Sequence, residues 1–330
     1  MSNVLAPFEG HPLNDIEGFV VVTNSMSSHG ADGMALAEAI QANEPHREVT
    51  VVDIDKDPTV SRDRLIEGMQ RGGVLQKLIV IGGGDGSLHY HTKAMFHPDM
   101  PADLQDWPFT ATPLGSAFDG YMATHDGSMI GYTPGILEHP DAHIIDVHPL
   151  ELTDEDETIL EHALLYLTAG PTAAAAKIYA SPEHRAKKAA HAERLGMLID
   201  LAGGLPAMWR PEQFLVEVDG QVAKMTEMQF INGDRMAIEA RYDTRLSRRE
   251  MHFGYTRHNN PAAIGATALR MKLGVAPGRR QVEPVQFTIR SGKPVPAQVN
   301  GEYFELPGGS TYIVRPSERR VRMWATRPDA

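Results

Sequence analysis

The stretch KLIVIGGGDGSLHYH, residues 77–91, decides the fold of this chain. Residues 78–81 are four large apolar side chains, three of them β-branched, and such a run predicts a strand buried on both faces of a sheet. Three glycines follow at residues 82–84, and after Asp85 a helix is expected to open near Ser87. This arrangement favours phosphate binding, because glycines let a ligand approach the backbone and a helix N-terminus attracts negative charge.

Asp85 has two interpretations. An acid inside such a turn would repel a bare phosphate, so Asp85 suggests a bound Mg²⁺, or a contact to a ribose or a water. The structural alternative is a tight turn in which Asp85 is the N-cap of the following helix. The stretch alone leaves both interpretations open.

The composition is that of a globular protein. A length of 330 residues suggests two domains, and a net charge of −12 argues against a general nucleic-acid binder. The absence of cysteine excludes disulfides, thiolate metal sites and cysteine nucleophiles, and it fits a reducing compartment. No Lys or Arg precedes Arg47, and no apolar run approaches the roughly 18 residues that span a bilayer. We therefore expect a cytoplasmic protein whose membrane contacts, if it makes them, are peripheral.

The first part of the chain alternates predicted strands and helices. Strands are predicted at residues 19–23, 48–54, 77–81 and 109–113, and helices at residues 35–42, 60–69 and 87–96. This order calls for a parallel sheet with helices on both faces. Turns of small or polar residues follow the first, third and fourth strands, and they would lie at the sheet edge where open α/β folds bind ligands.

The pattern changes after residue 143. Helices are predicted at residues 154–167 and 183–202, and short alternating runs then predict strands at residues 214–218, 221–224, 227–232, 236–240, 252–256, 285–290, 297–299 and 310–314. Asp219-Gly220 and Asn300-Gly301 are dipeptides typical of two-residue hairpin turns. The sequence therefore predicts an α/β domain at residues 1–143 with a parallel sheet, and a mainly antiparallel β-sandwich at residues 144–330 whose last strands return toward the first domain.

The order of these turns resembles the diacylglycerol kinase catalytic family. This family includes bacterial lipid kinases and the sphingosine and ceramide kinases, and it shares an ancestral nucleotide-binding domain with the NAD kinases. The resemblance covers most of the chain by motif order, and its specific motif is the Gly-Gly-Asp-Gly turn. It implies a kinase that uses ATP and Mg²⁺ to phosphorylate a hydroxyl of a lipid or lipid-like acceptor.

The resemblance also assigns residues. The positions that match the family's nucleotide contacts are Asn24, Ser25, Gly83, Gly84, Asp85, Gly86, Ser87, Gly115, Ser116 and Asp119. Asp85 is in addition the expected metal contact. The family's base, an Asp that accepts the proton of the lipid hydroxyl, falls on Asn300, and the family's Asn in the fourth-strand turn falls on Phe118. An Asn cannot accept that proton, so three outcomes stay open: a slow kinase, a kinase whose base is Glu302, Asp85 or a nearby His, and a protein that binds a nucleotide and transfers nothing.

The sequence gives less support to other interpretations. The glycines nearly fit a dinucleotide-binding fingerprint, but that motif normally follows the first strand rather than the third. An NAD kinase-like enzyme with a small-molecule acceptor is a further alternative. Among the fifteen histidines, the spacing of His89 and His91 favours surface or hydrogen-bonded side chains over a metal site.

Two basic clusters and the assembly state complete the expectations. The clusters are Arg241, Arg245, Arg248 and Arg249, and Arg315, Arg319, Arg320 and Arg322. They suggest either attraction to phosphates and anionic lipid headgroups or charge that protects hairpin edges, and the second is favoured. Peripheral membrane contact and a homodimer stay open.

Overall fold

The computed structural model describes residues 16–25, 30–73, 76–114, 119–125, 141–179, 181, 183–184, 211–236, 240–327 and 330. The chain divides into two compact units. One consists of Met1–Asp146 with Val321–Ala330, and the other of Val147–Arg320.

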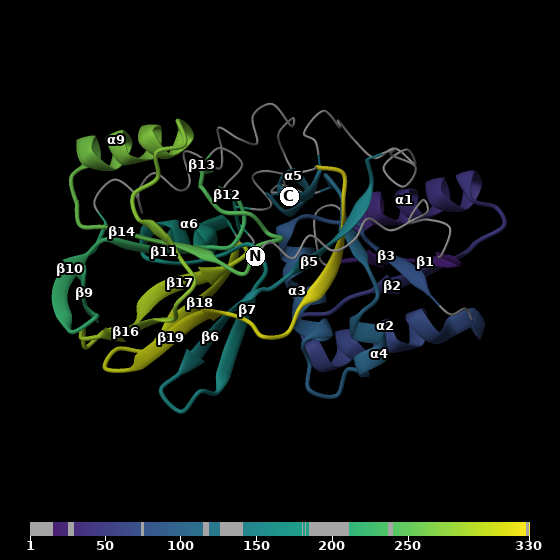
Figure 1. Cartoon of the computed structure of the whole chain (residues 1–330), viewed down its shortest axis with the longest axis horizontal. Coiled ribbons are helices and arrows are strands. Elements are labelled where there is room, and N and C mark those ends of the chain that lie inside the picture. The colour runs from purple at the N-terminus through teal and green to yellow at the C-terminus, as the bar shows by residue number, and fades with distance from the viewer. Residues whose placement is uncertain are drawn as a thin grey trace. The chain divides into compact units, whose positions relative to one another are not determined.

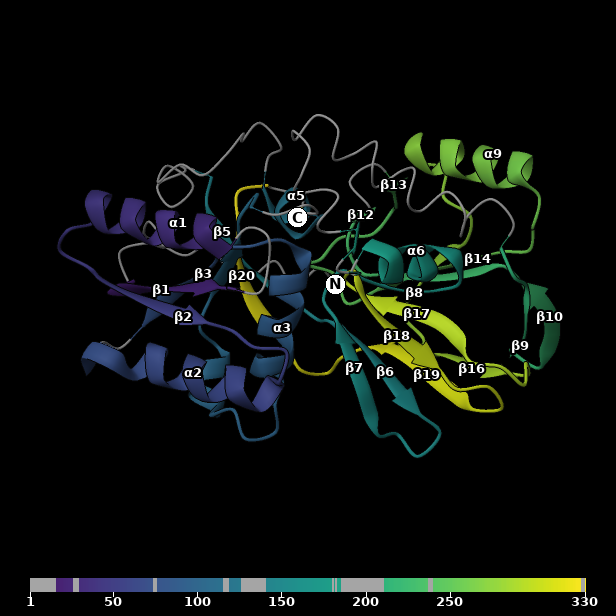
Figure 2. The same ribbon diagram turned by 180° about the vertical axis from the view of Figure 1, so that it is seen from behind.

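The first unit is built on a six-stranded sheet with the order β2-β1-β3-β4-β20-β5. Its strands are β1 (Gly18–Thr23), β2 (Glu48–Asp53), β3 (Lys77–Ile81), β4 (Phe109–Ala111), β5 (His143–Val147) and β20 (Val321–Ala325). Its helices are α1 (Gly30–Asn43), α2 (Pro58–Gln70), α3 (Asp85–Met95), α4 (Ala102–Gln105) and α5 (Asp119–Thr124), with a 3₁₀ turn at Arg71–Gly73. The pairs β1–β2, β1–β3, β3–β4 and β4–β20 are parallel. Figures 1 and 2 show α1 and α2 on opposite faces of this sheet.

The apolar run that organises the sequence lies at the centre of this sheet. All five residues of β3 are buried, as are all six of β1. Alternate side chains face opposite ways along a strand, so Leu78 and Val80 join Phe19 and Leu36 in one core cluster. The predicted strand buried on both faces is confirmed, and it places the glycine turn at the carboxyl edge of the sheet.

The second unit is an antiparallel β-sandwich. One sheet has the order β10-β9-β16-β19-β6-β7, the other has the order β15-β14-β11-β8-β17-β18, and β12 and β13 form a small ribbon. Its strands are β6 (Leu150–Asp154), β7 (Ile159–Ala163), β8 (Tyr166–Ala169), β9 (Phe214–Val218), β10 (Gln221–Met225), β11 (Glu227–Ile231), β12 (Arg235–Met236), β13 (Ala240–Arg241), β14 (Met251–Thr256), β15 (Arg279–Gln281), β16 (Val285–Ile289), β17 (Val295–Val299), β18 (Glu302–Leu306) and β19 (Thr311–Pro316). Its described helices are α6 (Pro171–Tyr179) and α9 (Pro261–Lys272).

Aromatic rings join the two sheets of the sandwich. Phe230 of β11 stacks on Phe287 of β16, with 5.7 Å between the ring centroids, and Phe253 of β14 stacks on Phe230 at 5.0 Å. These rings belong to one buried cluster that draws on both sheets. The predicted fold class, an α/β domain with a parallel sheet and a mainly antiparallel sandwich, is confirmed.

The prediction of a helix at residues 154–167 is wrong, because this segment forms the end of β6, then β7 and the start of β8. Its acids make a hairpin turn instead of the first turn of a helix. Asp154 Oδ1 accepts hydrogen bonds from the backbone N–H of Asp156 at 3.0 Å and of Thr158 at 2.8 Å, and Glu157 has a positive φ of 62°. Such local side-chain contacts compete with a helix. Most of the second predicted helix, residues 185–202, lies outside the described residues.

Candidate functional site

The glycine turn connects β3 to α3. The helix begins at Asp85, two residues before the predicted start at Ser87. Its N-cap is Gly84, which has no side chain with which to accept a hydrogen bond from the first turn. The N–H groups at the start of α3 therefore lack the usual side-chain cap, which is the condition under which a helix N-terminus can receive an anion.

Ser87 explains why the middle of this turn is glycine. A Cβ on Gly83 would lie 2.3 Å from Ser87 Oγ and 2.8 Å from Ser87 Cβ. A Cβ on Gly82 would lie 3.1 Å from the carbonyl oxygen of Val22 in β1. The turn is thus packed against its own helix and the neighbouring strand, and larger residues would displace it.

Asp85 joins the turn after β3 to the helix after β4. Its side chain is only 3% exposed. Oδ2 accepts a hydrogen bond from the backbone N–H of Asp119 and Oδ1 accepts one from that of Gly120, each at 3.1 Å. Asp85 therefore caps α5, whereas the N-cap interpretation of the sequence placed it on its own helix. The structure brings together Asp85 and Asp119, two of the predicted site residues.

The carboxyl of Asp85 lies in an unfavourable place for a charge. Burial, and then the nearby carboxyl of Asp119, raise the pKa of Asp85 to about 8. At neutral pH the protonated form is therefore favoured. A neutral Asp85 removes the repulsion that an acid in this turn would exert on a phosphate.

Asp85 does not fit the role of a direct Mg²⁺ ligand in this arrangement. Both of its oxygens already accept backbone hydrogen bonds, and magnesium ligation requires accessible carboxylate oxygens. Within the described part of the chain, there is also no group of three or more His, Asp or Glu side chains that could hold a metal ion.

Asp53 holds the turn that follows β1, and sequence reasoning missed it. Its Oδ1 accepts a hydrogen bond from the backbone N–H of Ser25, and its Oδ2 accepts one from Ser25 Oγ, both at 2.7 Å. Asn24 precedes Ser25 and is half-buried. The signal for Asp53 was an acid at the end of the second strand, at the same sheet edge as the other turns. The predicted contacts Gly115 and Ser116, and Phe118, lie outside the described residues.

Asn300 is a structural residue of the second unit. It is fully buried at the turn of the β17–β18 hairpin, with φ of 47°, and Gly301 follows with φ of 87°. Its Oδ1 accepts hydrogen bonds from the backbone N–H of Leu165 at 2.9 Å and of Tyr166 at 3.2 Å. Asn300 thus ties the hairpin to the connection between β7 and β8. Glu302 is half-buried at the start of β18.

The prediction that His89 and His91 are surface side chains is wrong. Both residues belong to α3, and both are buried. His91 is fully buried, its ring packs edge-on against Phe109 of β4 with 4.8 Å between centroids, and neither ring nitrogen has a hydrogen-bond partner. Burial lowers its pKa to about 3. The sequence spacing could not show this, since the apolar neighbours of His91 come from another strand.

Replacing His91 by Leu should make the protein less sensitive to acid. Between pH 3 and pH 6.5 the unfolded chain binds a proton at this histidine and the folded chain does not, so the wild-type free energy of unfolding falls as pH drops through this window. At pH 5 the loss is about 2 kcal/mol. Urea unfolding at pH 5 and pH 8 should show a smaller difference for His91→Leu than for wild type. The exposed His46→Leu serves as the control, and an equal pH dependence in all three proteins would contradict the assignment.

Three of the eight arginines in the basic clusters form ion pairs with acids of the described chain. Arg315 lies 3.2 Å from Glu151, Arg248 lies 3.7 Å from Glu250, and Arg249 pairs with Glu318. These pairs support the interpretation of these arginines as surface charge of the sandwich rather than as a phosphate site.

Comparison with known proteins gives a likeness of fold. No family model matches the sequence, and no curated protein matches it. A solved structure of a protein provisionally named a diacylglycerol kinase, from Bacillus anthracis, matches 95% of this chain and 99% of its own, with a TM-score of 0.60 and 13% identity. A structure described as a diacylglycerol kinase from the same organism matches 94% of this chain and 97% of its own, with a TM-score of 0.60 and 14% identity.

None of the described helices has the length and apolar character that crossing a bilayer requires.

The structural matches cover both units of the chain. Together with the order of the turns, they confirm the resemblance at the level of the fold: this chain has the fold of the diacylglycerol kinases.

Proposed function

We propose that the chain transfers a phosphoryl group from ATP, in the presence of Mg²⁺, to a hydroxyl of a lipid or lipid-like acceptor. The observation that carries the proposal is the turn at residues 83–87, an uncapped helix N-terminus that follows three glycines at the carboxyl edge of a parallel sheet. The shared fold with proteins named diacylglycerol kinases supports it.

The residues of the turn suit a phosphate. The backbone N–H groups at the start of α3 would hold the phosphate oxygens, and Gly83 and Gly84 leave the backbone open to approach. Phosphoryl transfer depends mainly on positioning and on neutralising charge, and a phosphate-bound Mg²⁺ supplies the second. Because Asp85 does not fit as its ligand, we propose that the ion comes with the nucleotide.

The base for the acceptor hydroxyl is the open part of this proposal. Asn300 is a poor candidate, since an amide cannot accept a proton and its oxygen already accepts two backbone hydrogen bonds. Asp85 has a pKa close to the range of an effective general base, but both of its oxygens accept backbone hydrogen bonds, so it would have to release one of them to act. Glu302 is the other carboxylate predicted from the sequence. A nucleotide-binding protein without transfer is therefore the second candidate function, favoured by the structural contacts of Asn300.

A transfer assay tests the proposal. The protein would be incubated with γ-labelled ATP and mixed micelles that contain diacylglycerol, a sphingoid base or a ceramide, with Mg²⁺ or with a chelator. We expect a labelled lipid only when Mg²⁺ is present. ATP binding without any labelled product would support the second candidate, and the absence of both binding and transfer would overturn both.

A further inference from the structure

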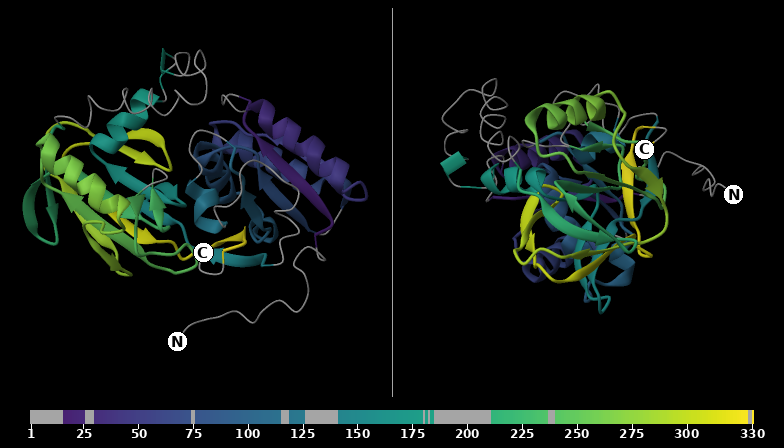
Figure 3. Two further views of the ribbon diagram at one scale, coloured as in Figure 1. Left: turned by 90° about the horizontal axis from the view of Figure 1, so that it is seen from above. Right: turned by 90° about the vertical axis from the view of Figure 1, so that its left-hand side faces the viewer.

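Helix α9 of the second unit exposes an apolar stripe. Both panels of Figure 3 show α9, in light green, at the outside of the unit. The exposed residues at helical spacing along it are Ala262, Ala266, Leu269 and Leu273, which lie four, three and four residues apart and so share one face. Leu269 is 59% exposed and Leu273 is 71% exposed, which makes Leu273 the most exposed large apolar side chain among the described residues.

The stripe continues beyond the end of the helix. Val275 is 52% exposed and Val282 is 60% exposed, the first before β15 and the second directly after it. The opposite side of α9 packs inward, since Met271 is only 8% exposed. One face of the helix therefore packs on the unit, where α9 contacts β13, while a second apolar face meets solvent.

The charge of this segment is opposite to that of the whole protein. Residues 251–282 contain no Asp or Glu, whereas the chain as a whole has 43 acids and a net charge of −12. The cations of the segment are Arg257, Arg270, Lys272, Arg279 and Arg280. Arg270 is exposed and lies between the two exposed leucines in the sequence.

Two of these arginines also contact acids from other parts of the unit. Arg280 lies 3.5 Å from Glu250 and 3.7 Å from Asp243, and Arg279 lies 3.9 Å from Asp219. Arg257 instead lies over the ring of Tyr255, 5.1 Å from its centroid. Within the described residues neither Arg257 nor Arg270 forms an ion pair, and both are exposed, so this segment carries positive charge without an acidic partner alongside the leucines.

From this combination we infer that the α9 surface, defined as α9 with Val275, Val282 and the arginines at 257, 270, 279 and 280, docks on an anionic lipid bilayer. Exposed leucines on a helix that lies in the membrane plane bury themselves at the boundary between headgroups and acyl chains. Arginines beside them attract anionic headgroups. The acidic remainder of the chain would be repelled, so this charge pattern selects one face for contact.

The inference deepens the proposed function. It rests on that function for the reason why the protein would dock on a membrane, and not for the docking itself. A lipid acceptor is found in a membrane, and docking by α9 would hold the enzyme at that source. The binding itself requires neither ATP nor transfer. Vesicle binding without transfer would keep this inference and count against the kinase, and transfer to micelles without vesicle binding would do the reverse.

Vesicle co-sedimentation of the full chain tests the inference. Wild type should bind vesicles that mix phosphatidylglycerol with phosphatidylcholine, and should bind phosphatidylcholine alone much more weakly. The double variant Leu269→Ser/Leu273→Ser should lower the partition coefficient roughly tenfold or more. Arg270→Ser should lower it about fivefold. Raising the salt from about 0.1 M to about 1 M should release wild type, because the Debye length falls from about 10 Å to about 3 Å.

The chain offers a matched control on β7. Ile159 and Leu160 are 43% and 41% exposed, and they follow a run of four acids at residues 154–157. Ile159→Ser/Leu160→Ser removes as many exposed apolar side chains from a surface that anionic lipid should repel, so its vesicle binding should equal that of wild type. Circular dichroism would establish that each variant is folded. No binding by wild type, binding that survives the α9 substitutions, or equal loss in the control would overturn the inference, as would a protein partner that α9 binds while vesicles do not.

Discussion

Replacement of Asp85 by alanine should reduce phosphoryl transfer by about 10²- to 10⁴-fold on the hypothesis that Asp85 is the base, since this is the range of a lost acid–base group. Asp85 is the one acid within the glycine turn, and its carboxyl also fixes the start of α5 through the N–H groups of Asp119 and Gly120. Without it these two N–H groups lose their acceptor, and the free energy of unfolding should fall by about 1–3 kcal/mol. Steady-state transfer and urea unfolding would measure the two effects separately.

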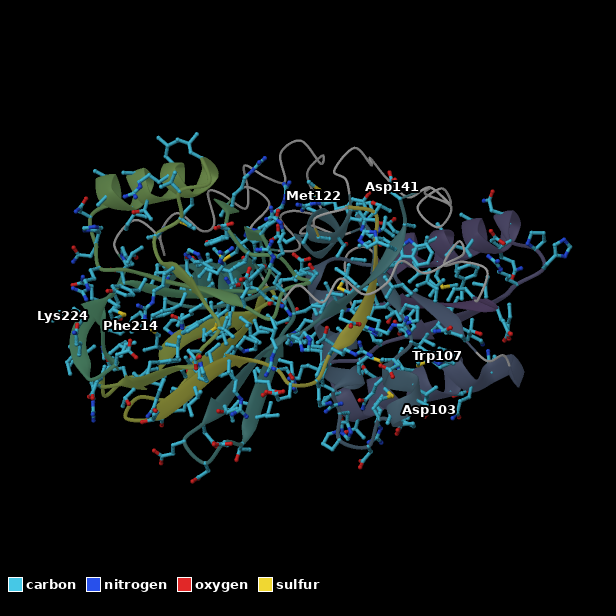
Figure 4. The ribbon with its side chains drawn as sticks, viewed as in Figure 1. Asp103, Trp107, Met122, Asp141, Phe214 and Lys224 are labelled. Atoms are coloured by element: carbon cyan, nitrogen blue, oxygen red, sulfur yellow. The ribbon has the colours of Figure 1, made fainter. Side chains whose placement is uncertain are left out.

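Two further variants separate the chemical role of Asp85 from its capping role. Asp85→Asn keeps one acceptor oxygen for α5 but cannot exchange a proton, so it should be more stable than Asp85→Ala and equally inactive. Asp103→Ala, on the exposed side of α4 (Figure 4), removes a carboxylate of the same unit and should change neither quantity. Full transfer activity in Asp85→Asn would contradict a chemical role and leave Asp85 as a capping residue.

Replacement of Asn300 by alanine should lower the free energy of unfolding by about 3–5 kcal/mol. The change leaves the buried N–H groups of Leu165 and Tyr166 without their acceptor, and it places an alanine at a φ of 47°. Urea denaturation followed by circular dichroism would measure the loss.

The conservative variants of Asn300 divide this loss into its causes. Asn300→Gly removes the same acceptor but tolerates the left-handed backbone, so it should be about 1 kcal/mol more stable than Asn300→Ala. Asn300→Asp retains an oxygen for both N–H groups and should be the most stable of the three. It also restores the carboxylate of the related kinases, so a large gain in turnover would indicate an activity weakened by this substitution. Unfolding midpoints that coincide for all four proteins would contradict the structural role.

The parts of the fold that could be predicted depend on local patterns. All four residues at 78–81 are apolar, so the strand presents apolar side chains to both faces of the sheet. Such a run is typical of a central strand in a sheet whose two faces are both buried. The dipeptides Asp219-Gly220 and Asn300-Gly301 predicted hairpins because these residues tolerate positive φ, and the structure has positive φ at all four. A signal carried by a few adjacent residues can be read without knowing the rest of the chain.

The sequence patterns did not predict segments whose structure depends on residues far away in the chain. The pattern predicts no helix at residues 171–179, yet α6 forms there and packs on β17 and β18. Helix α9 was also missed, although Asn260 caps it by accepting the N–H of Ala263 at 2.8 Å and Pro261 occupies its first turn. Its apolar residues face both the interior of the unit and solvent, and a pattern without a single apolar face does not predict an amphipathic helix.

The residues of the candidate site also divide into those that a local pattern predicts and those that depend on distant contacts. The glycine turn was predicted because its residues are consecutive. The partner of Asp85 lies 34 residues further along the chain, at the backbone of Asp119, and no spacing rule connects the two. Asp53 was missed for the same reason, since its contact to Ser25 follows only from the pairing of β1 with β2.

The central claim is that the turn at residues 83–87 receives the phosphates of a nucleotide. Hydrogen–deuterium exchange of the full chain, with and without ATP and Mg²⁺, tests it most directly, because the proposed ligands are backbone N–H groups. We expect slower exchange in peptides that cover residues 82–88 when the nucleotide is present, and no change there in a Gly83→Val variant, whose side chain would collide with Ser87. Nucleotide binding that leaves this peptide unchanged and protects another part of the chain would contradict the account.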